Sequence, residues 1–453
     1  MIKHTLIAAL LIATLSSCKK EATTGKDEEK TTAFVPYTHD KAENAVIYEA
    51  NIRQYSPEGT FEAFTKDIPK LKELGVKVLW VMPVYPIGEK NRKEGLGSYY
   101  SIRDYRGINP EFGTKEDFKK LIATAHENGI YVIMDWVANH TAWDHPWITE
   151  HPDYYVKDKK GNLVSPYDWT DVAELDYANP EVRKAMVSEM SYWVTDFNID
   201  GFRCDMAHEV PTDFWNDAVG KIAPGKTLFM LGETENADLL EKAFDVVYGW
   251  ELHHITNDIA QGKKNVKAYD DYIRKNDSLL QPDDFKMNFT SNHDENTWSG
   301  TEYERMGDAV ELFAALTYMT PGMPLIYNGQ EYDSKVRLKF FEKDQITHDK
   351  GKMYPVYEKL GKLKNENPAL NGGKKAAAYK RIATSSDLNV LAFNRSKDNQ
   401  EVLFIGNLTK AAQSFTVPVS GVYLDYMKGT KVTLSQDQKY TYQPWEYKIL
   451  VKQ

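Results

Sequence analysis

Short apolar segments alternate with helix-like segments along most of this chain. Between residues 45 and 331, eight segments are rich in apolar and β-branched residues, and segments with helical spacing of apolar residues lie between them. Nearly continuous apolar runs are typical of parallel strands that are covered on both faces. The eight segments are residues 45–56, 76–86, 130–140, 199–207, 228–235, 245–252, 285–295 and 323–331. This series predicts an α/β fold in which a parallel sheet closes into a (β/α)8 TIM barrel.

Two of the intervening segments carry signals for helix ends. Residues 61–75 keep helical spacing of their apolar side chains and end at Gly75. Thr114 and Asp117 resemble a capping box, and Gly129 ends the helix that follows them.

The alternation is interrupted once and ends near residue 370. Residues 141–178 contain WDHPW, HPDYY and SPYDWTD, which are too aromatic for a linker and too irregular for a helix. We therefore expect a small domain inserted after the third strand. The barrel is then expected over residues 44–140 and 179–369. Residues 370–453 hold short strand-like segments separated by turn residues, which predicts a carboxyl-terminal antiparallel β domain.

The amino terminus reads as an export signal followed by a tether. Residues 1–17 hold Lys3 and a short apolar run over residues 6–15, which is too short to span a bilayer. The sequence Leu-Ser-Ser-Cys ending at Cys18 resembles the lipobox of bacterial lipoproteins, so we expect lipidation of Cys18; a plain secretory signal is the alternative. Residues 18–43 are then a polar tether. We expect an exported protein that meets the membrane only through its lipid anchor, on the periplasmic or cell-surface side. The acidic residues 27–29 favour the outer membrane.

Charge and cysteine content exclude other classes. A net charge of -10 argues against nucleic acid as a partner. If Cys18 is lipidated, Cys204 is the remaining one of the two cysteines, so no internal disulfide can form. Strand alternation turns the Cys204 side chain away from those of its neighbours Arg203 and Asp205, which predicts a packed thiol without a catalytic role.

Polar residues gather where four of the eight strands end. These residues are Asp135, Asn139 and His140, then Arg203 and Asp205, then Glu233, and finally Asn292, His293 and Asp294. In such barrels the carboxyl ends of the strands form one mouth, and catalysis takes place there. A single Asp at such a junction is often only a helix cap. Three carboxylates with an arginine predict glycosyl transfer through a covalent intermediate, with nucleophile and proton donor on facing strands about 5 to 5.5 Å apart.

Four motifs carry a resemblance to a known family. DWVANH (135–140), GFRCD (201–205), GE (232–233) and NHD (292–294) resemble, in order and spacing, the motifs of glycoside hydrolase family 13, the α-amylase family. The resemblance covers roughly residues 44–453. It implies a (β/α)8 barrel, a domain inserted after the third strand and a carboxyl-terminal β-sandwich. The chain thus looks like a bacterial lipoprotein of the α-amylase type.

The resemblance also implies roles for individual residues. Asp205 is then the nucleophile, Glu233 the general acid/base and Asp294 the carboxylate that binds sugar hydroxyls. Arg203 would hold Asp205 ionised, whereas Glu233 would need a pKa raised by burial and by its carboxylate neighbours. The substrate-binding residues implied by the family motifs are Tyr100, Asp104, His140, Arg203, His208, Glu209 and His293. Tyr99 departs from the glycine that usually precedes the stacking tyrosine.

Two departures bear on specificity and on metal binding. His208 and Glu209 resemble the Asn-Glu pair of the neopullulanase and cyclomaltodextrinase branch, with His in place of Asn. That branch usually has an extra domain before the barrel, for which this chain has no room. Asn139 matches a calcium ligand of many members, and Glu174 stands where another has Asp, so Ca2+ is an expected but open cofactor.

The resulting hypothesis is a retaining α-amylase that cleaves α-1,4-glucosidic bonds of starch or maltodextrins. The alternatives are a cyclomaltodextrinase or neopullulanase, a 4-α-glucanotransferase and, less favoured, a non-catalytic glucan-binding protein. The last reading conflicts with the presence of Asp205, Glu233 and Asp294. The sequence leaves endo or exo action and the oligomeric state open.

Overall fold

A computed structural model of the protein describes residues 34–453. The expected signal peptide, Cys18 and the first part of the expected tether lie outside the described residues. No helix within residues 34–453 has the length and apolar character needed to cross a membrane.

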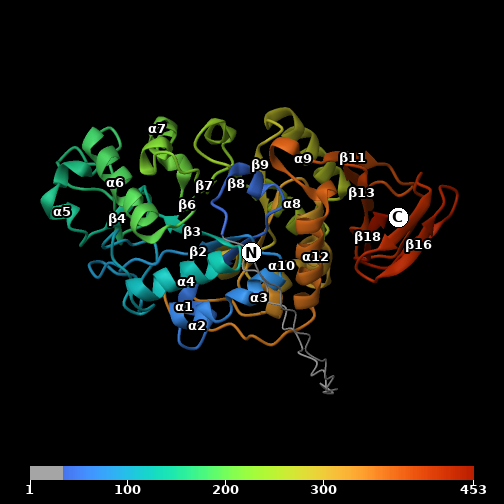
Figure 1. Ribbon diagram of the computed structural model, residues 1–453, viewed down its shortest axis with the longest axis horizontal. Coiled ribbons are helices and arrows are strands. Elements are labelled where there is room, and N and C mark those ends of the chain that lie inside the picture. Colours follow the sequence, from blue (N-terminus) through green and yellow to red (C-terminus); the bar gives the residue numbers. More distant parts are fainter. Residues whose placement is uncertain (1–33) are drawn as a thin grey trace, which may run out of the picture. The chain divides into compact units, whose positions relative to one another are not determined.

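Eight parallel strands of the described chain close into a barrel (Figure 1). Around the barrel they follow the order β1-β10-β9-β8-β7-β6-β3-β2. The strands are β1 (Ile47–Ala50), β2 (Val78–Val81), β3 (Tyr131–Trp136), β6 (Gly201–Cys204), β7 (Phe229–Gly232), β8 (Val246–Tyr248), β9 (Phe285–Asn288) and β10 (Met323–Tyr327). All eight fall within the segments expected from the sequence, and the prediction of a (β/α)8 barrel is confirmed.

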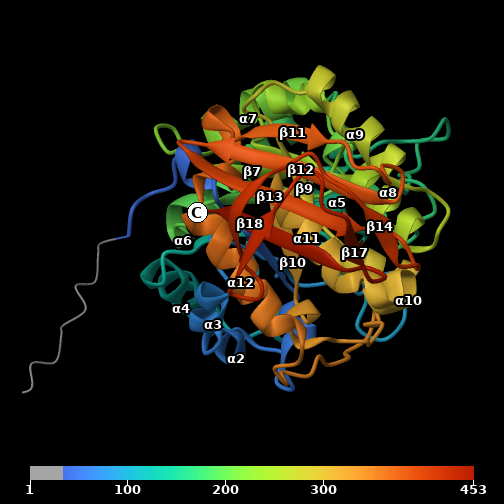
Figure 2. The same ribbon diagram turned by 90° about the vertical axis from the view of Figure 1, so that its right-hand side faces the viewer.

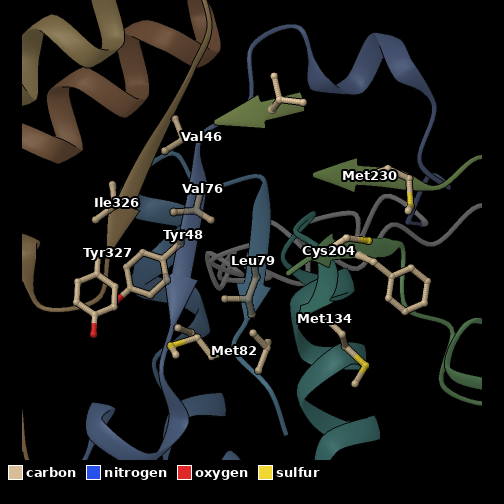
Figure 3. Close-up of a cluster of buried hydrophobic side chains, with 14 of the residues drawn as sticks. Val46, Tyr48, Val76, Leu79, Met82, Met134, Cys204, Met230, Ile326 and Tyr327 are labelled. Carbon is tan, nitrogen blue, oxygen red and sulfur yellow. The ribbon is translucent and has the colours of Figure 1, made fainter. Parts of the chain in front are cut away.

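The apolar character of these strands has a simple physical cause. Alternate side chains enter two different buried clusters, one inside the barrel and one between the barrel and its helices. On β6, Phe202 and Cys204 belong to the outer cluster, which Figure 3 shows with Met134 and Met230 near Cys204. Arg203 between them belongs to neither cluster. Cys204 is a buried free thiol, as its position in the strand predicted.

Twelve α-helices of the described chain connect or flank the strands. They are α1 (Ile52–Tyr55), α2 (Phe61–Thr65), α3 (Ile68–Glu73), α4 (Lys115–Glu127), α5 (Trp147–Glu150), α6 (Pro180–Phe197), α7 (Thr212–Ile222), α8 (Trp250–Ala260), α9 (Val266–Leu279), α10 (Glu302–Met306), α11 (Val310–Met319) and α12 (Met353–Glu366). The capping box of Thr114 and Asp117 is present at the start of α4. The single helix expected over residues 61–75 is instead split into α2 and α3. Pro69 explains the break, because proline lacks an N–H and belongs in the first turn of a helix.

A small substructure follows β3, where the sequence predicted an insertion. Strands β4 (His140–Ala142) and β5 (Val172–Glu174) pair antiparallel, and α5 lies between them in the chain. The register places His140 opposite Glu174, so this substructure borders the barrel mouth directly.

The carboxyl-terminal part is antiparallel, as predicted. Its strands are β11 (Ala378–Ile382), β12 (Val390–Lys397), β13 (Gln400–Asn407), β14 (Gln413–Phe415), β15 (Gly421–Asp425), β16 (Thr430–Leu434), β17 (Tyr440–Tyr442) and β18 (Tyr447–Lys452). Six of them form one sheet, and β14 pairs with β17 in a second, with an apolar cluster that both sheets share. Figure 2 shows the larger sheet in front of the barrel elements. Buried Arg395 joins the two parts by donating from Nη1 to the Met319 carbonyl at 3.0 Å.

Two aromatic residues of the segment 34–43, which the sequence assigned to the tether, pack against barrel residues in the structure. Tyr37 is 2% exposed and meets the rings of Tyr131 and Phe229 edge-on at centroid distances of 5.4 and 5.5 Å. Phe34 stacks on His126. The tether prediction is therefore wrong for this segment. The two aromatic residues stand without helical or strand periodicity, so no pattern in the sequence marked them as core.

Candidate active site

The barrel register brings the two central carboxyl groups together. Cys204 at the end of β6 pairs with Gly232 at the end of β7, so the next residues, Asp205 and Glu233, leave neighbouring strands at the same height. The sequence analysis placed nucleophile and proton donor on facing strands; the structure corrects this to adjacent strands. Both residues are less than a tenth exposed.

Arg203 lies beside both of these carboxyl groups and also contacts a third, that of Asp135. Its Nη1 is 2.8 Å from Asp135 Oδ1 and 3.1 Å from Asp205 Oδ1, and its Nη2 is 2.8 Å from Glu233 Oε2. Nε donates to the Tyr248 hydroxyl at 3.1 Å. The side chain is fully buried, so these charges interact with little screening by solvent. One guanidinium therefore fixes the positions of three carboxylates from three strands.

The electrostatics of the Asp205 and Glu233 pair differ from the expectation. Burial and the neighbouring Glu233 raise the pKa of Asp205 well above its usual value. Burial also opposes ionisation of Glu233, but Arg203 and the backbone N–H of Met206 outweigh it and lower the pKa of Glu233. The sequence analysis expected an ionised Asp205 and a raised pKa for Glu233. Within the pair, the surroundings therefore favour ionisation of Glu233 over ionisation of Asp205.

Tyr100 and His293 form the floor of the site beside this pair. The Tyr100 hydroxyl donates to Asp135 Oδ2 at 3.0 Å and lies 2.9 Å from His293 Nε2. Their rings are stacked, with centroids 5.5 Å apart. Asp294 Oδ2 is 3.4 Å from the same nitrogen of His293. His140 is buried on the other side of the pocket, and burial lowers its pKa to about 4, so it is neutral near pH 7.

Tyr99, which replaces the usual glycine, has packing partners of its own. The guanidinium of Arg53 lies 4.2 Å from the centre of the Tyr99 ring, and Asn51 Nδ2 donates to the Tyr99 hydroxyl at 3.2 Å. The side chain is buried, which leaves Tyr100 free to face the site.

A pocket of about 430 Å³ opens over these groups. Of the predicted residues it is lined by Tyr100, His140, Asp205, Glu233, His293 and Asp294, and it also exposes Lys93, Asp168, Trp169, Asp171, Trp298, Phe340 and Phe341. Polar groups therefore occupy its base, and aromatic rings form its walls. This composition suits a sugar, whose hydroxyls need hydrogen bonds and whose ring faces are apolar.

Four predicted substrate-binding residues do not line this pocket, and one of them, Arg203, is fully buried. Asp104 is exposed and accepts the Arg106 backbone N–H at 2.8 Å, so it stabilises a local turn. His208 and Glu209 stand outside the pocket, where His208 Nδ1 is 3.3 Å from the Glu233 carbonyl oxygen. The Tyr167 hydroxyl of the inserted substructure donates to Glu209.

Three aromatic residues of the pocket were not predicted from the sequence. Trp298 follows Asp294 by four residues and lies on a π-helical turn, a feature that is frequent at functional sites. Phe340 and Phe341 lie in the loop after the eighth barrel strand. In this fold the loops that follow the strand ends form the active site. A pair of aromatic residues in such a loop could therefore have been predicted to line the pocket.

The two predicted calcium ligands lie side by side without a larger donor set. Asn139 immediately precedes β4, and Glu174 ends β5 opposite His140. Among residues 34–453, no group of three or more His, Cys, Asp or Glu side chains is arranged to hold a metal ion. Ca2+ takes six to eight oxygen ligands, so this pair alone does not make a site. Calcium binding stays a prediction, and no catalytic step is assigned to it.

Comparison with known proteins agrees with this geometry. The family model of the α-amylase catalytic domain matches residues 26–172 and 166–364. The α-amylase MalA of Haloarcula japonica is 26% identical over 411 residues, which are 86% of this chain and 59% of that protein. Alpha-amylase 3 of Dictyoglomus thermophilum is 24% identical over 461 residues, 84% of this chain and 89% of that protein.

Solved structures give a second, independent comparison. The maltogenic α-amylase AmyB of Thermotoga neapolitana has a TM-score of 0.84 and 30% identity, over 91% of this chain and 99% of that chain. An α-amylase of Lactobacillus plantarum has a TM-score of 0.82 and 31% identity, over 91% and 100%. Strand order, the carboxylates at the barrel mouth and the family match lead to one conclusion: the chain is a glycoside hydrolase and belongs to family 13, the α-amylase family.

Proposed function

We propose that this enzyme hydrolyses α-1,4-glucosidic bonds of starch or maltodextrins with retention of the anomeric configuration. The observation that carries the proposal is the convergence of Asp205, Glu233 and Asp294 on one pocket with aromatic walls. Retention requires a nucleophile and an acid/base on opposite sides of one bond, and adjacent strand ends can supply both.

In the first step, Asp205 attacks the anomeric carbon while Glu233 gives a proton to the departing glycosidic oxygen. A covalent glycosyl-Asp205 ester forms, and the shortened glucan leaves with a hydroxyl group. In the second step, Glu233 takes a proton from water, the water oxygen attacks the anomeric carbon, and the Asp205 carboxylate is released. Asp294 accepts hydrogen bonds from sugar hydroxyls throughout.

This sequence of steps requires one proton to move within the pair. In the unliganded protein Asp205 has the raised pKa, and the neighbouring Glu233 is one cause of it. Attack by Asp205 needs the ionised form, so its proton passes to Glu233 before or during the first step. Arg203 stabilises Asp205 once the proton has left, because it remains within hydrogen-bond distance.

The proposal is tested with maltoheptaose. We expect shorter maltooligosaccharides, released first as α-anomers in the NMR spectrum. Initial release of β-anomers would refute retention, and no cleavage at all would refute the activity. A second candidate is glucan transfer, which is favoured by the 27% identity of a 4-alpha-glucanotransferase of Thermotoga neapolitana over 61% of this chain. Products longer than maltoheptaose would identify it. Parallel incubations with pullulan and cyclodextrin test the neopullulanase and cyclomaltodextrinase alternatives.

We also propose that Cys18 carries a lipid anchor and that the enzyme acts outside the inner membrane. The support is the apolar run followed by Leu-Ser-Ser-Cys in the sequence. Cells fed radioactive palmitate should label the wild-type protein and not Cys18→Ala. Equal labelling of both would refute the anchor.

A further inference from the structure

A buried glutamate without a role in the proposed chemistry lies directly behind His293. Glu49 on β1 is 0% exposed and faces the barrel interior, in register with Trp80 and Tyr327 on the flanking strands. Its Oε1 is 2.5 Å from His293 Nδ1 and 3.4 Å from the His293 backbone nitrogen. Its Oε2 is buried and has no hydrogen-bond partner within the described residues. Burial of this carboxylate costs free energy, and its side-chain hydrogen-bond partner among the described residues is the imidazole of His293.

With Glu49 and Asp135 ionised, the hydrogen bonds around His293 favour a proton on each ring nitrogen. Glu49 Oε1 already accepts the backbone N–H of His293, so it meets Nδ1 as an acceptor, and Nδ1 carries a proton. On the other side, the Tyr100 hydroxyl has one proton and gives it to Asp135 Oδ2. Asp135 acts as an acceptor there, because Trp80 Nε1 donates to the same oxygen at 3.1 Å. The Tyr100 oxygen must then accept from His293 Nε2, so Nε2 carries a proton as well.

We propose that Glu49 is a positioning residue that keeps His293 as a doubly protonated imidazolium, so that Nε2 acts only as a donor: to the Tyr100 oxygen in the unliganded protein and to a hydroxyl of the bound sugar in the complex. Without a carboxylate behind it, a neutral imidazole whose Nδ1 is protonated would present an Nε2 lone pair to the same hydroxyl. The charge of the imidazolium also strengthens the hydrogen bond that it donates. That the acceptor is a sugar hydroxyl rests on the proposed function. The protonation state of His293 does not depend on it.

The charges around His293 agree with this assignment. Burial alone would lower its pKa, but Asp294 and Glu49 outweigh burial and raise the pKa of His293 to about 9. Titratable groups face the ring from five elements of the site: Glu49, Tyr100, Asp135, Arg203 and Glu233, together with Asp294 beside it in the chain. Arg203 is the cation among them, and it opposes the charge on His293. The carboxylates therefore outweigh one guanidinium.

The test replaces Glu49 by an isosteric neutral residue. Glu49→Gln keeps the shape and an oxygen acceptor but removes the charge, whereas Glu49→Asp keeps the charge and moves it back by one methylene. The ring nitrogens of His293 are followed by 15N NMR of the full chain from pH 5 to 10, with the signals assigned by their loss in His293→Gln. Glu331→Gln is the matched control, because Glu331 is equally buried but bonds Tyr48 on the far side of β1.

In the wild type we expect both ring nitrogens of His293 to be protonated at pH 8. In Glu49→Gln the pKa of His293 should fall by about 1 to 3 pH units, the effect of removing one opposite charge at close range. Glu49→Asp should retain most of the wild-type value, and Glu331→Gln all of it. A His293 pKa in Glu49→Gln within half a unit of wild type, or a singly protonated ring in the wild type at pH 7, would overturn the proposal.

Activity supplies a second readout. The ratio of kcat/KM at pH 8 to that at pH 6 on maltoheptaose should fall roughly three- to tenfold in Glu49→Gln relative to wild type, because the imidazolium is lost at the higher pH. An unchanged ratio would contradict the role of the charge in catalysis. Absence of maltoheptaose cleavage by the wild type would instead refute the proposed function. The NMR titration needs no substrate and would still decide the protonation state.

Discussion

Replacing Arg203 by lysine tests whether one guanidinium organises the carboxylates of the site. The substitution keeps a positive charge but replaces a planar fork by a single ammonium. An ammonium placed where Nη1 lies can still meet Asp135 and Asp205. It cannot also reach Glu233, now held by Nη2 at 2.8 Å, or Tyr248, held by Nε at 3.1 Å.

The expected loss follows from those two contacts. The hydrogen bond to Tyr248 has a charged donor, and such bonds contribute about 1.5 to 3 kcal/mol. With the ion pair to Glu233 added, Arg203→Lys should cost roughly 2 to 4 kcal/mol of unfolding free energy. With the unfolding entropy typical of a chain of this length, that lowers Tm by roughly 2 to 5 °C. Loss of the charged contact to Glu233 should lower kcat/KM by roughly 10- to 150-fold.

The effect on stability should depend on pH with a defined sign. Arg203 helps to hold the pKa of Glu233 below its ordinary 4.5, so ionised Glu233 contributes stability above that pH and loses it as the pH falls through its lowered pKa. Lysine removes most of this contribution. The difference in Tm between wild type and variant should therefore be largest near pH 7 and should shrink below pH 4.5.

Differential scanning calorimetry at pH 7 and pH 4, with initial rates on maltoheptaose, measures both effects. Arg395→Lys is the matched control, since Arg395 is equally buried but donates to backbone carbonyls such as that of Met319. It should lower Tm and leave kcat/KM unchanged. If Arg203→Lys retained wild-type kcat/KM, or if its Tm deficit were the same at both pH values, the shared-guanidinium reasoning would be refuted.

Three further predictions concern the nucleophile, the pocket wall and the metal. Asp205→Asn should lower kcat by at least roughly 10⁴-fold. It should leave Tm equal or higher, because burial and Glu233 already disfavour the charge of Asp205. Calorimetry and a residual-activity assay check this, and turnover near the wild-type rate would reassign the nucleophile. Trp298→Ala should raise KM for maltoheptaose roughly tenfold and change kcat less. The reason is that the Trp298 side chain is 58% exposed in the unliganded protein and would be covered by the sugar. An unchanged KM would place the substrate elsewhere. The predicted calcium ligands Asn139 and Glu174 are tested with EDTA. A fall in Tm of several degrees that Ca2+ reverses would confirm a bound ion, and an unchanged Tm would refute the calcium prediction.

Much of the fold was predictable because the strands of a closed parallel barrel are buried on both faces. Phe202 and Cys204 enter one cluster while Leu231 on the adjacent strand enters the other, so no polar face interrupts the pattern. The break at Pro69 has a local cause that apolar spacing does not register, because proline belongs in the first turn of a new helix. The packing of Tyr37 depends on one residue meeting a distant surface, and such a contact leaves no periodic signal.

The candidate site was predictable wherever chemistry coincides with a strand end. Asp205 and Glu233 follow β6 and β7 directly, so locating the strands located the carboxylates. Glu49 escaped notice because it sits in the middle of a strand, where a single polar residue resembles an irregularity. Trp298 and Phe340 were missed because loop conformation, not spacing, turns their rings toward the pocket.

The protonation pattern of the site cannot be predicted from the spacing of residues in the sequence. Sequence reasoning assigned the raised pKa to Glu233 because the acid/base of the reaction needs a proton. In the folded chain Arg203 Nη2 lies 2.8 Å from Glu233 Oε2 and the Met206 N–H donates to the same oxygen, and both favour its ionised form. Because the two carboxyls interact this closely, the pH dependence of kcat/KM should report the pair as a unit rather than either carboxyl alone.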